Sequence, residues 1–540
     1  MNLRRKRMML MDGQWYGYLR TASGNPLTLQ AAKRLRKLTI YGNAVQDGTP
    51  SPDAPVEVQL CGDRTGNLWD RAYSDVDANW VGNRGEYKYL NLKLKENTTY
   101  TLFVKQNNMH HGYSDYWDSD DNLVAFYVGE NPNTWKGNTA FGNTTNNNPK
   151  QVYSFTTTEA PYYFNLFIRN YNDRTVKQVF DELLPGIMLV QGSYTADTLP
   201  AYEPYGYKVS GRAEGLNLFD KENASIVKGA VMKTTLEFIG ESDGAYSYMR
   251  CDPNTTYTIN KLPQSGIVCT ANQIPATGAV ANSRISAAEE GMELSLITVT
   301  TGNDDTYLWI ALIPSTGGKY TAEEMLDSLQ VLKGTYTAST IPPYEPYQTP
   351  QDFAVYLPEQ IAKVGDVADE MVVDMEAKTA ELRKNVGSVV VSDRLASSAT
   401  GSKGDDIALF YKLFPDRFIA NSETVSVMSD KLVGLSLSDY KNSSSKDMLS
   451  LAGNNTNTAV FMKLSKTDIG GDTAESANTW IADNRITVYY VLATPVTTDI
   501  TSLQQWDAMP QVSGTVTLTL SAEVEPSGAE AVYYSKERGE

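Results

Sequence analysis

Cysteine and histidine are scarce in this sequence, and their scarcity excludes several classes of protein. Only three cysteines, Cys61, Cys251 and Cys269, occur among 540 residues, and their odd number and irregular spacing argue against a disulfide framework and a zinc site. We expect them to be buried free thiols. The two histidines, His110 and His111, are adjacent, and neighbours on a strand face opposite ways, so they are poorly placed to share a metal ion.

Long apolar runs are also absent. No window approaches 18 continuous apolar residues, so the sequence predicts no membrane-spanning helix. The N-terminal stretch MNLRRKRMMLMD is basic, but its apolar run of four residues is too short for a signal peptide. We therefore expect a protein that is made in the cytosol and does not insert into a membrane.

Basic residues are sparse except near the N-terminus. The formal net charge is −17, yet residues 1–60 contain nine Lys and Arg against four Asp and Glu. This asymmetry predicts that the segment contacts a partner that the rest of the chain does not. Nucleic acid fits poorly, because the basic arm is short and the acidic body would repel phosphates. A protein socket is the favoured interpretation.

A duplicated motif is the strongest feature that is present. GSYTADTLPAYEPY begins at Gly192 and GTYTASTIPPYEPY at Gly334, with 10 of 14 positions identical. Three further matches occur in the same order in both copies: GNLWD with LNLFD, NTTYTL with NTTYTI, and YFNLFI with TYLWIA. An ordered series of this kind indicates internal duplication of one module of roughly 140 residues.

Each copy has the pattern of a β-sandwich. Segments such as TTYTLFVK place an apolar or aromatic residue at every second position, the period of a half-buried strand. Thr175 with Gln178 and Thr321 with Glu324 have the spacing of a capping box, which predicts one short helix before the last strand. Many strands with one helix favour a jelly roll. The YEPY tail is interpreted as a joint between modules, or alternatively as a tyrosine cluster that grips a ligand.

Residues 351–395 follow a different period. Spacings of three and four residues relate eight positions, six of them apolar: Ile361, Val364, Ala368, Met371, Met375, Lys378, Leu382 and Asn385. This period predicts a helix, either a coiled coil or an amphipathic helix packed on its own chain.

The expected fold class is therefore mainly β, with tandem jelly-roll-like sandwich modules and a short helical segment between the second and third. The third module is divergent, with Asp472 and Glu475 at capping-box spacing, and Val516, Leu518 and Leu520 alternate in a C-terminal hairpin that turns at EPSG. The predicted divisions are a basic attachment segment (1–60), two repeated modules (61–206 and 207–350), a helical linker (351–395), a third module (396–505) and a hairpin (506–540).

Catalytic motifs are not recognisable. No GxSxG elbow accompanies the histidines, and no pair among the 64 acidic residues is singled out for glycoside hydrolysis. Asp118, Asp120 and Asn122 have the alternating oxygens of a calcium loop. Leu123 and Gly129 stand where an EF-hand requires Gly and Glu, so a polar hairpin turn is favoured. We predict no enzyme activity, no cofactor and no metal site.

Recognition of a ligand at the protein surface by aromatic side chains is the remaining candidate function. Aromatic rings offer flat faces to the C–H face of a sugar, and nearby Asp, Asn and Thr can hydrogen-bond to hydroxyls. The first module has the densest mixture, with Asn-rich loops at 131–133 and 143–148. Its candidate carbohydrate-binding residues are Trp80, Tyr113, Tyr116, Trp117 and Trp135. Each one alone is more often a packing residue, as we expect for Trp309 in the second module.

Several stretches resemble a known group of proteins. Residues Leu38–Asp70, the NLFDKEN opening, the YEPY tails and ITVYYVLATPVTTDIT are similar to segments of minor structural and host-recognition proteins of tailed phages that infect Gram-positive bacteria. The similar segments are spread over most of residues 38–500, whereas the first 37 residues match poorly and the third module lacks an NLFD opening. The resemblance implies a virion protein of the tail tip or baseplate, assembled in the host cytoplasm, attached by its N-terminal part to other tail proteins. It also implies a homotrimer that contacts cell-wall carbohydrate.

Three functions remain open on this basis. Binding of bacterial cell-surface glycan through several weak sites is the favoured one. A purely structural tail or baseplate spacer is the alternative, and a glycan-degrading tail enzyme is the third. A bacterial adhesin would need an export signal or an anchor, and the sequence shows neither.

Overall fold

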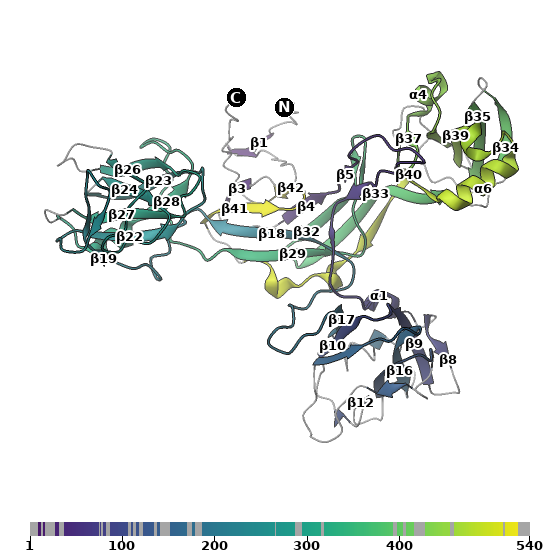
Figure 1. The fold of residues 1–540 in the computed structure, drawn as a ribbon, viewed down its shortest axis with the longest axis horizontal. Coiled ribbons are helices and arrows are strands. Elements are labelled where there is room, and N and C mark those ends of the chain that lie inside the picture. Colours follow the sequence, from purple (N-terminus) through teal and green to yellow (C-terminus); the bar gives the residue numbers. More distant parts are fainter. Residues whose placement is uncertain are drawn as a thin grey trace.

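The computed structural model describes residues 9–11, 14–16, 27–31, 37–74, 76, 79–82, 87–105, 110–111, 115–117, 123–133, 138–140, 152–169, 175, 177–178, 186–264, 266–286, 294–314, 318–391, 397–402, 407–414, 427–453, 458–510 and 514–527. The structure is mainly β, with 46% strand, as the composition predicted. A central hub carries three lobes that extend in different directions (Figure 1). Each lobe is one stretch of sequence, whereas the hub is assembled from four stretches and an edge strand, β36, that lies within one of the lobes.

The hub is a pair of antiparallel sheets. In spatial order, one sheet contains β29 (Gln351–Leu357), β18 (Tyr207–Gly215), β41 (Gly514–Leu520) and β3 (Leu27–Ala31), with β7 (Asp63–Arg64) also paired to β18. The other contains β36 (Val427–Ser429), β40 (Ile486–Asp499), β33 (Thr379–Val391), β32 (Glu370–Asp374), β4 (Lys37–Tyr41) and β42 (Glu523–Ser527). Strands from both ends of the chain therefore lie side by side.

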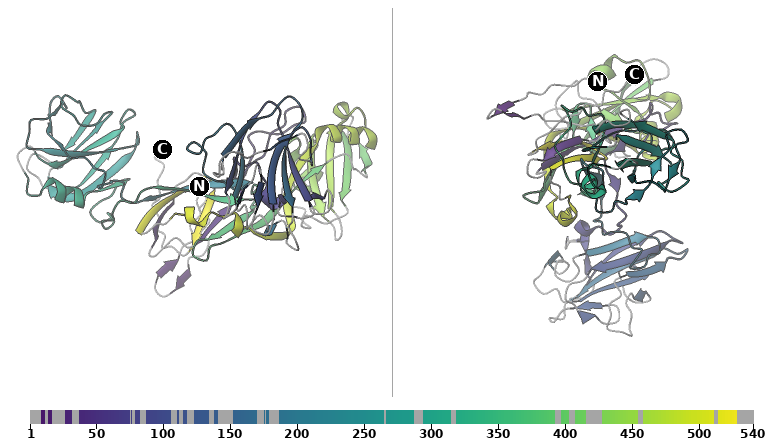
Figure 2. Two further views of the ribbon diagram at one scale, coloured as in Figure 1. Left: turned by 90° about the horizontal axis from the view of Figure 1, so that it is seen from below. Right: turned by 90° about the vertical axis from the view of Figure 1, so that its left-hand side faces the viewer.

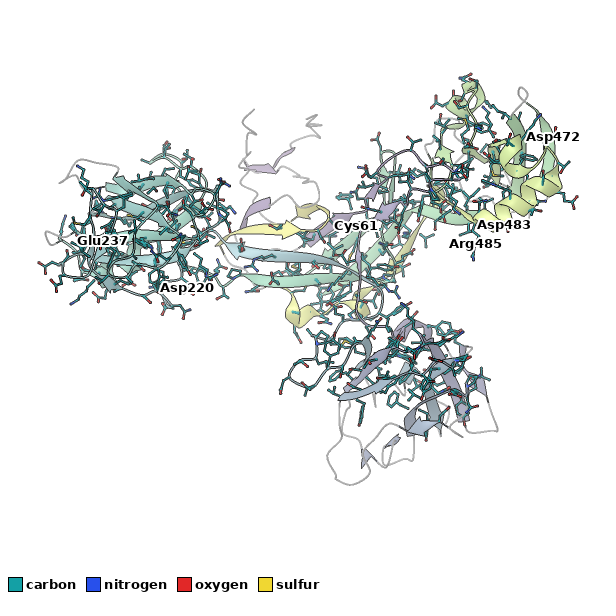
Figure 3. The ribbon with its side chains drawn as sticks, in the orientation of Figure 1. Cys61, Asp220, Glu237, Asp472, Asp483 and Arg485 are labelled. Atoms are coloured by element: carbon teal, nitrogen blue, oxygen red, sulfur yellow. The ribbon has the colours of Figure 1, made fainter. Side chains whose placement is uncertain are left out.

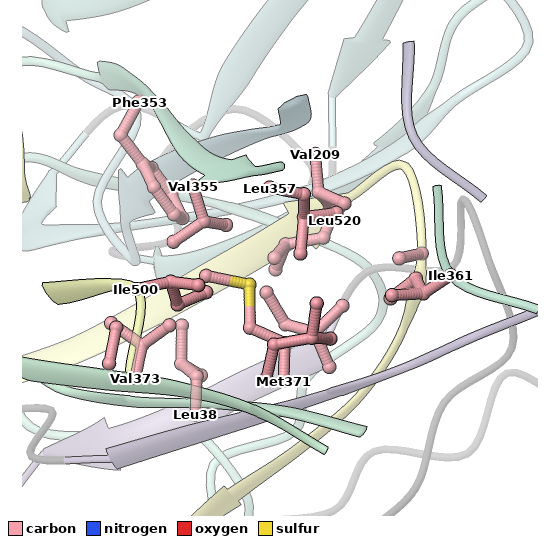
Figure 4. Packing of buried hydrophobic residues seen from close by; sticks show 14 of the residues in the cluster. Leu38, Val209, Phe353, Val355, Leu357, Ile361, Met371, Val373, Ile500 and Leu520 are labelled. Carbon is pink, nitrogen blue, oxygen red and sulfur yellow. The ribbon is translucent and has the colours of Figure 1, made fainter. Parts of the chain in front are cut away.

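Apolar residues from both sheets meet in one buried cluster. Along β29, Phe353, Val355 and Leu357 point into it, because side chains on a strand alternate between its two faces. The residues labelled in Figure 4 are Leu38, Val209, Phe353, Val355, Leu357, Ile361, Met371, Val373, Ile500 and Leu520. The hub core thus requires the early and the late parts of the chain at the same time.

Each lobe replaces a turn between two neighbouring hub strands. The residues that flank each insertion lie directly opposite one another in a strand pair: Arg64 and Tyr207, Ala213 and Gln351, and Val391 and Ile486. We call the inserted stretches the first lobe (65–206), the second lobe (216–350) and the third lobe (392–485). Figure 2 shows the second lobe in its left view and the first lobe in its right view, each set apart from the hub.

The first lobe packs a seven-stranded sheet against a three-stranded one. The larger sheet contains β11 (His110–His111), β12 (Asp115–Trp117), β13 (Leu123–Gly129), β16 (Tyr162–Arg169), β9 (Tyr87–Leu94) and β8 (Val81–Gly82), with β14 (Thr139–Ala140) on β13. The smaller contains β15 (Val152–Thr156), β10 (Thr99–Lys105) and β17 (Gly186–Gln191), and a short helix, α1 (Arg71–Ser74), precedes them. Leu102 and Leu189 meet Phe126 and Phe164 between the sheets.

The second lobe repeats this pairing. Its five-stranded sheet contains β19 (Val227–Lys228), β22 (Ala245–Arg250), β27 (Tyr307–Ile313), β24 (Ile267–Ala271) and β25 (Ser283–Ser286). Its three-stranded sheet contains β26 (Leu294–Thr300), β23 (Thr256–Gln264) and β28 (Gln330–Lys333), next to α3 (Ala322–Ser328). The order β26-β23-β28 matches β15-β10-β17, and β24-β27-β22 matches β13-β16-β9. The capping boxes at Thr175 and Thr321 are both formed.

A buried asparagine explains why the opening and closing motifs recur together. Asn217, 1% exposed, accepts hydrogen bonds through Oδ1 from the backbone N–H groups of Phe219 and Val331, both at 3.0 Å. Its Nδ2 donates to the carbonyls of Leu329 (3.3 Å) and Glu345 (3.1 Å). The asparagine of the NLFD motif therefore joins the first segment of the lobe, its last strand and the YEPY tail. In the first lobe the same four bonds join Asn67 to Trp69, Leu189, Ile187 and Glu203.

The YEPY tails lie where each lobe returns to the hub. Arg64 of β7 lies over the rings of Tyr205 (4.3 Å to the centroid) and Tyr207 (5.1 Å). Gln505 donates from Nε2 to the carbonyl of Tyr202 at 2.6 Å. The tail is thus a joint, as predicted, but it joins a lobe to the hub rather than one module to the next.

The third lobe has a different construction. Its sheet contains β34 (Ser397–Ser402), β35 (Ile407–Phe414), β39 (Thr458–Ser465), β38 (Met448–Gly453) and β37 (Val433–Gly434), and its helices are α4 (Leu437–Asn442), α5 (Lys466–Ile469) and α6 (Ala474–Asn484). The N-cap of α6 is Thr473, which accepts from the Ser476 N–H, so the predicted Asp472–Glu475 box is wrong by one residue. In Figure 3, Asp483 and Arg485 mark the end of α6, where the chain returns to β40.

The predicted helical linker at 351–395 is wrong, because its described part, residues 351–391, contains hub strands and no helix. Gly365, with φ 59°, allows a tight turn between β30 (Lys363–Val364) and β31 (Val367–Ala368). Lys378, with φ 52°, ends the turn between β32 and β33. Met371 and Leu382, which fitted the helical spacing, lie opposite each other across these strands and are both buried. Buried positions on successive strands of this stretch also fit the three- and four-residue spacing of a helix, and the sequence pattern was therefore misread as a helix.

The two terminal segments also belong to the hub. Within the predicted attachment segment, β3 and β4 are hub strands, so residues 27–60 do not form a separate arm. The predicted C-terminal hairpin is wrong as well. β41 pairs with β18 and β3, whereas β42 pairs with β4 in the opposite sheet. The chain crosses between the sheets at Ser521–Ala522, and the EPSG sequence begins inside β42.

Candidate functional site

The structure describes only part of the predicted aromatic cluster in the first lobe. Trp80 is 6% exposed, packs in the core between the sheets and donates from Nε1 to the Ser74 carbonyl at 2.7 Å. Such a ring has no free face for a sugar, so this candidate is a packing residue. Tyr116 and Trp117 lie on β12, of which only the backbone is described. Tyr113 and Trp135 lie outside the described residues, as does the predicted turn at 118–122.

The two histidines and the cysteines, the residues considered for metal binding and catalysis, lie within the described part of the chain. His110 and His111 lie opposite Trp117 and Tyr116 on paired strands. Within the described ranges, no group of three or more His, Cys, Asp or Glu side chains is arranged to hold a metal ion. No helix in those ranges is long and apolar enough to cross a membrane. Cys61 and Cys269 are buried, and burial raises the pKa of each thiol to about 12, which makes both poor nucleophiles.

The second lobe contains a cleft of about 440 Å³ at one end of its five-stranded sheet. β22 ends there, β27 begins there, and the loops after residue 218 and after β24 form its sides. We call it the aromatic cleft; its principal residues are Asp220, Asn223, Tyr248, Arg250, Ile274 and Tyr307. Asp220, labelled in Figure 3, lies on the side of the lobe toward the hub.

Two tyrosine rings and an arginine form the centre of the aromatic cleft. The rings of Tyr248 and Tyr307 meet edge to face, with centroids 6.2 Å apart and planes at 68°. Arg250 lies opposite Tyr307 across the two strands, and its guanidinium is 5.8 Å from that ring centroid. Both tyrosines are half-buried and Arg250 is exposed, so a ligand can reach all three. An edge-to-face pair offers two ring surfaces at an angle, which suits a non-planar ring such as a pyranose.

The sides of the cleft are held by the lobe itself. Trp309, fully buried as predicted, donates from Nε1 to the Gln273 carbonyl at 2.8 Å, which fixes the loop that carries Ile274. Ile274 is 46% exposed and adds apolar surface to the rim. On the other side, Ser247 donates from its hydroxyl to the Ser225 carbonyl at 3.0 Å, which ties the opposite loop to β22.

A loop is bonded to the sheet at the same place in the first lobe. Tyr100 and Tyr257 accept matching hydrogen bonds from Lys95 and Asp252, which makes Asn91 the counterpart of Tyr248, Lys93 of Arg250, and Tyr163 of Tyr307. Asn91 donates to the Asn133 side chain at 2.5 Å, and Asn165 accepts from the Asn133 backbone at 3.0 Å. These amides draw the loop after β13 onto the sheet. The Asn131–Asn133 loop was predicted to hydrogen-bond to sugar hydroxyls, but it forms these hydrogen bonds within the lobe.

A second, larger hollow lies on the hub but offers no free charge. It has a volume of about 710 Å³ and lies over β18 and β29, beside the YEPY tail of the first lobe. Its charged side chains are already paired, Lys208 with Glu203 and Arg212 with both Glu214 and Asp352. We therefore regard the aromatic cleft as the better candidate site.

Sequence reasoning missed this cleft because it ranked the modules by the density of aromatic residues and Asn-rich loops, which favoured the first module. The available signal was the spacing of Tyr246 and Tyr248 in AYSYMR, which places both rings on one face of a strand. Tyr307 is the second residue of TYLWIA, and the match with YFNLFI is one residue out of register, since Tyr163 corresponds to Tyr307 and not to Thr306. Comparison with protein-family models and with curated proteins finds no match to this chain.

Proposed function

We propose that this protein is a tail or baseplate component of a phage or phage-like particle that binds cell-surface carbohydrate through its second lobe. The observation that carries the proposal is the accessible edge-to-face pair of Tyr248 and Tyr307 beside Arg250, at a position where the first lobe has Asn91 bonded to its own loop in place of the second ring. Aromatic surface with a few polar groups at its rim is the usual composition of a sugar site. The two sandwich lobes are proposed to be jelly rolls.

The architecture supports an extended, outward-reaching protein. Three lobes leave one hub by narrow connections, so a hub fixed in a particle would hold the lobes toward a surface (Figure 1). Several weak sites on an oligomer, a homotrimer in this proposal, would add to useful avidity. The attachment partner is another tail protein, bound through the basic N-terminal residues. Neither a nucleic acid nor a cofactor is required.

The test is binding of the full-length protein to purified cell walls from a panel of Gram-positive bacteria. We expect Tyr307→Ala and Tyr248→Ala each to weaken binding about tenfold, because each removes one stacking face. Tyr163→Ala, the matched position in the first lobe, should bind like wild type. Both cleft tyrosines are half-buried, so thermal unfolding of each variant should confirm that the lobe still folds.

Three outcomes would contradict the proposal or its assignment to the aromatic cleft. Failure of wild type to bind any wall would favour the structural spacer, whose lobes need no ligand. Release of reducing ends, measured in the same tubes, would instead show a glycan-degrading enzyme. Equal binding by Tyr307→Ala and wild type would move the site away from the aromatic cleft.

A further inference from the structure

Arg250 has an unused binding capacity that the proposed function does not require. Its guanidinium carries five N–H donors, and among the residues that the structure describes no carboxylate forms an ion pair with it. The guanidinium lies over the ring of Tyr307, and within the described part of the chain no side-chain hydrogen bond occupies the edge of the planar group. An exposed arginine next to an aromatic ring in a concave site is well placed to bind an anion in a forked pair of hydrogen bonds.

The acidic side chain of the cleft does not neutralise this arginine. Asp220 turns its carboxylate into its own loop: Oδ1 accepts from the backbone of Glu222 at 3.1 Å and of Asn223 at 3.4 Å. Its Oδ2 accepts from Nδ2 of Asn223 at 2.8 Å. The neighbouring Lys221 is paired with Asp327 at 2.9 Å. The oxygens of Asp220 are therefore occupied within its own loop although the carboxylate keeps its negative charge, whereas the N–H donors of the Arg250 side chain have no acidic partner among the described residues.

A tyrosine opposite a cation recurs in both lobes. Tyr163 lies opposite Lys93 in the first lobe, just as Tyr307 lies opposite Arg250 in the second. Only the second lobe adds another ring, Tyr248, where the first has Asn91 bound to its own loop. The tyrosine and cation are therefore joined by a second ring in the second lobe alone. The first lobe, which has the same tyrosine–cation pair without that ring, supplies a natural control.

We infer that the aromatic cleft selects an acidic saccharide, with a sugar ring against Tyr248 and Tyr307 and a carboxylate or phosphate on Arg250. This inference rests on the proposed function. The net charge of the chain is −17, so long-range attraction cannot supply the selectivity. The local guanidinium must supply it through short, directed hydrogen bonds.

The experiment measures the affinity of the full-length protein for matched pairs of probes. One pair is an oligogalacturonate and its methyl ester, and the other is a 6-phosphorylated oligosaccharide and its dephosphorylated form. We expect tighter binding of one charged member by about tenfold or more, the range of a charge-assisted hydrogen bond. The pair that shows the preference identifies whether the anion is a carboxylate or a phosphate.

Variants separate this inference from the proposed function. Arg250→Gln should remove the preference for the charged probe, Arg250→Lys should restore part of it, and Lys93→Gln in the first lobe should leave it unchanged.

Equal affinity for charged and neutral probes, with binding lost only in Tyr307→Ala, would overturn the inference of an acidic ligand and leave the proposal of carbohydrate binding intact. Loss of the preference in Lys93→Gln would overturn the assignment to this cleft. Binding to none of the probes and to no wall would overturn both.

Discussion

Asn217 illustrates how much of a lobe can depend on one side chain. Four hydrogen bonds to backbone groups converge on its buried amide, and they connect segments more than 100 residues apart in the sequence. Alanine would leave two backbone N–H groups and two carbonyls without these partners inside the lobe. Each unsatisfied buried group destabilises by roughly 1–3 kcal/mol, so the amide matters more for what its loss exposes than for its own contacts.

We therefore predict that Asn217→Ala destabilises the second lobe by about 3 kcal/mol. Hydrogen exchange should show faster exchange of the amides of Phe219 and Val331, which donate to Asn217, while the hub stays protected. Asn223→Ala, an exposed asparagine near the same motif, serves as the control and should change little. Unchanged exchange in Asn217→Ala would show that the YEPY tail is held by other contacts.

At the scale of elements, β33 is the strand that links the hub to the third lobe. Its pairing with β40 shifts register between Lys384 and Val386, which marks an irregularity at that point. The fully buried Asp369 stabilises this irregularity: Oδ1 accepts from the backbone of Asn385 at 2.7 Å and of Val386 at 2.8 Å. Its Oδ2 accepts from the backbone of Ala362 at 2.8 Å and pairs with Nζ of Lys384 at 2.8 Å.

We predict that Asp369→Ala destabilises the hub by roughly 3–5 kcal/mol, because it leaves the largely buried Lys384 ammonium and three N–H groups without their acceptor. Glu359→Gln is the matched control. Glu359 is the second, 59% exposed partner of Lys384 at 3.5 Å, and exposed pairs contribute little. Urea unfolding of both variants, followed by intrinsic fluorescence, measures the difference. Similar losses in both would mean that Asp369 is not the main partner.

At the scale of the whole molecule, the lobes are insertions at the tips of hub hairpins. Ala213 and Gln351, which flank the second lobe, are directly paired. Replacing residues 214–350, which are the second lobe and the last two residues of β18, by Asn-Gly, a sequence that favours a two-residue hairpin turn, should therefore leave the hub and the first lobe folded. Circular dichroism and hydrogen exchange in β29 would measure this, and wall binding should be lost together with the lobe.

The opposite deletion is the control for this prediction. Removing residues 351–391 takes out β29, β32 and β33 and should unfold the hub, although it removes far fewer residues. An unfolded hub after excision of the second lobe would show that lobe and hub fold as one cooperative unit. Linear order along the chain is thus a poor guide to what can be removed.

The sequence by itself determined the local and repeated features. Alternation in TTYTLFVK predicted strands, Thr321 with Glu324 predicted a cap, and the YEPY repeats predicted a duplicated unit with a joint at its end. These features depend on neighbours within a few residues or on a second copy, and both can be read along the chain. Trp309 was placed in the core for the same reason.

Tertiary structure alone decided the hub and the site. Met371 and Leu382 fit a helical period, and only the partners at β4 and β40 make their stretch a pair of strands. Those partner strands lie more than 100 residues away in the sequence, and no local sequence pattern predicts them. The aromatic cleft likewise exists because Tyr248 and Tyr307 meet across paired strands, and because the loop after β24 is bonded to Trp309, whereas the matching loop of the first lobe is bonded to Asn91, the counterpart of Tyr248. Contact between distant residues creates both features, and such contact is a property of the folded chain.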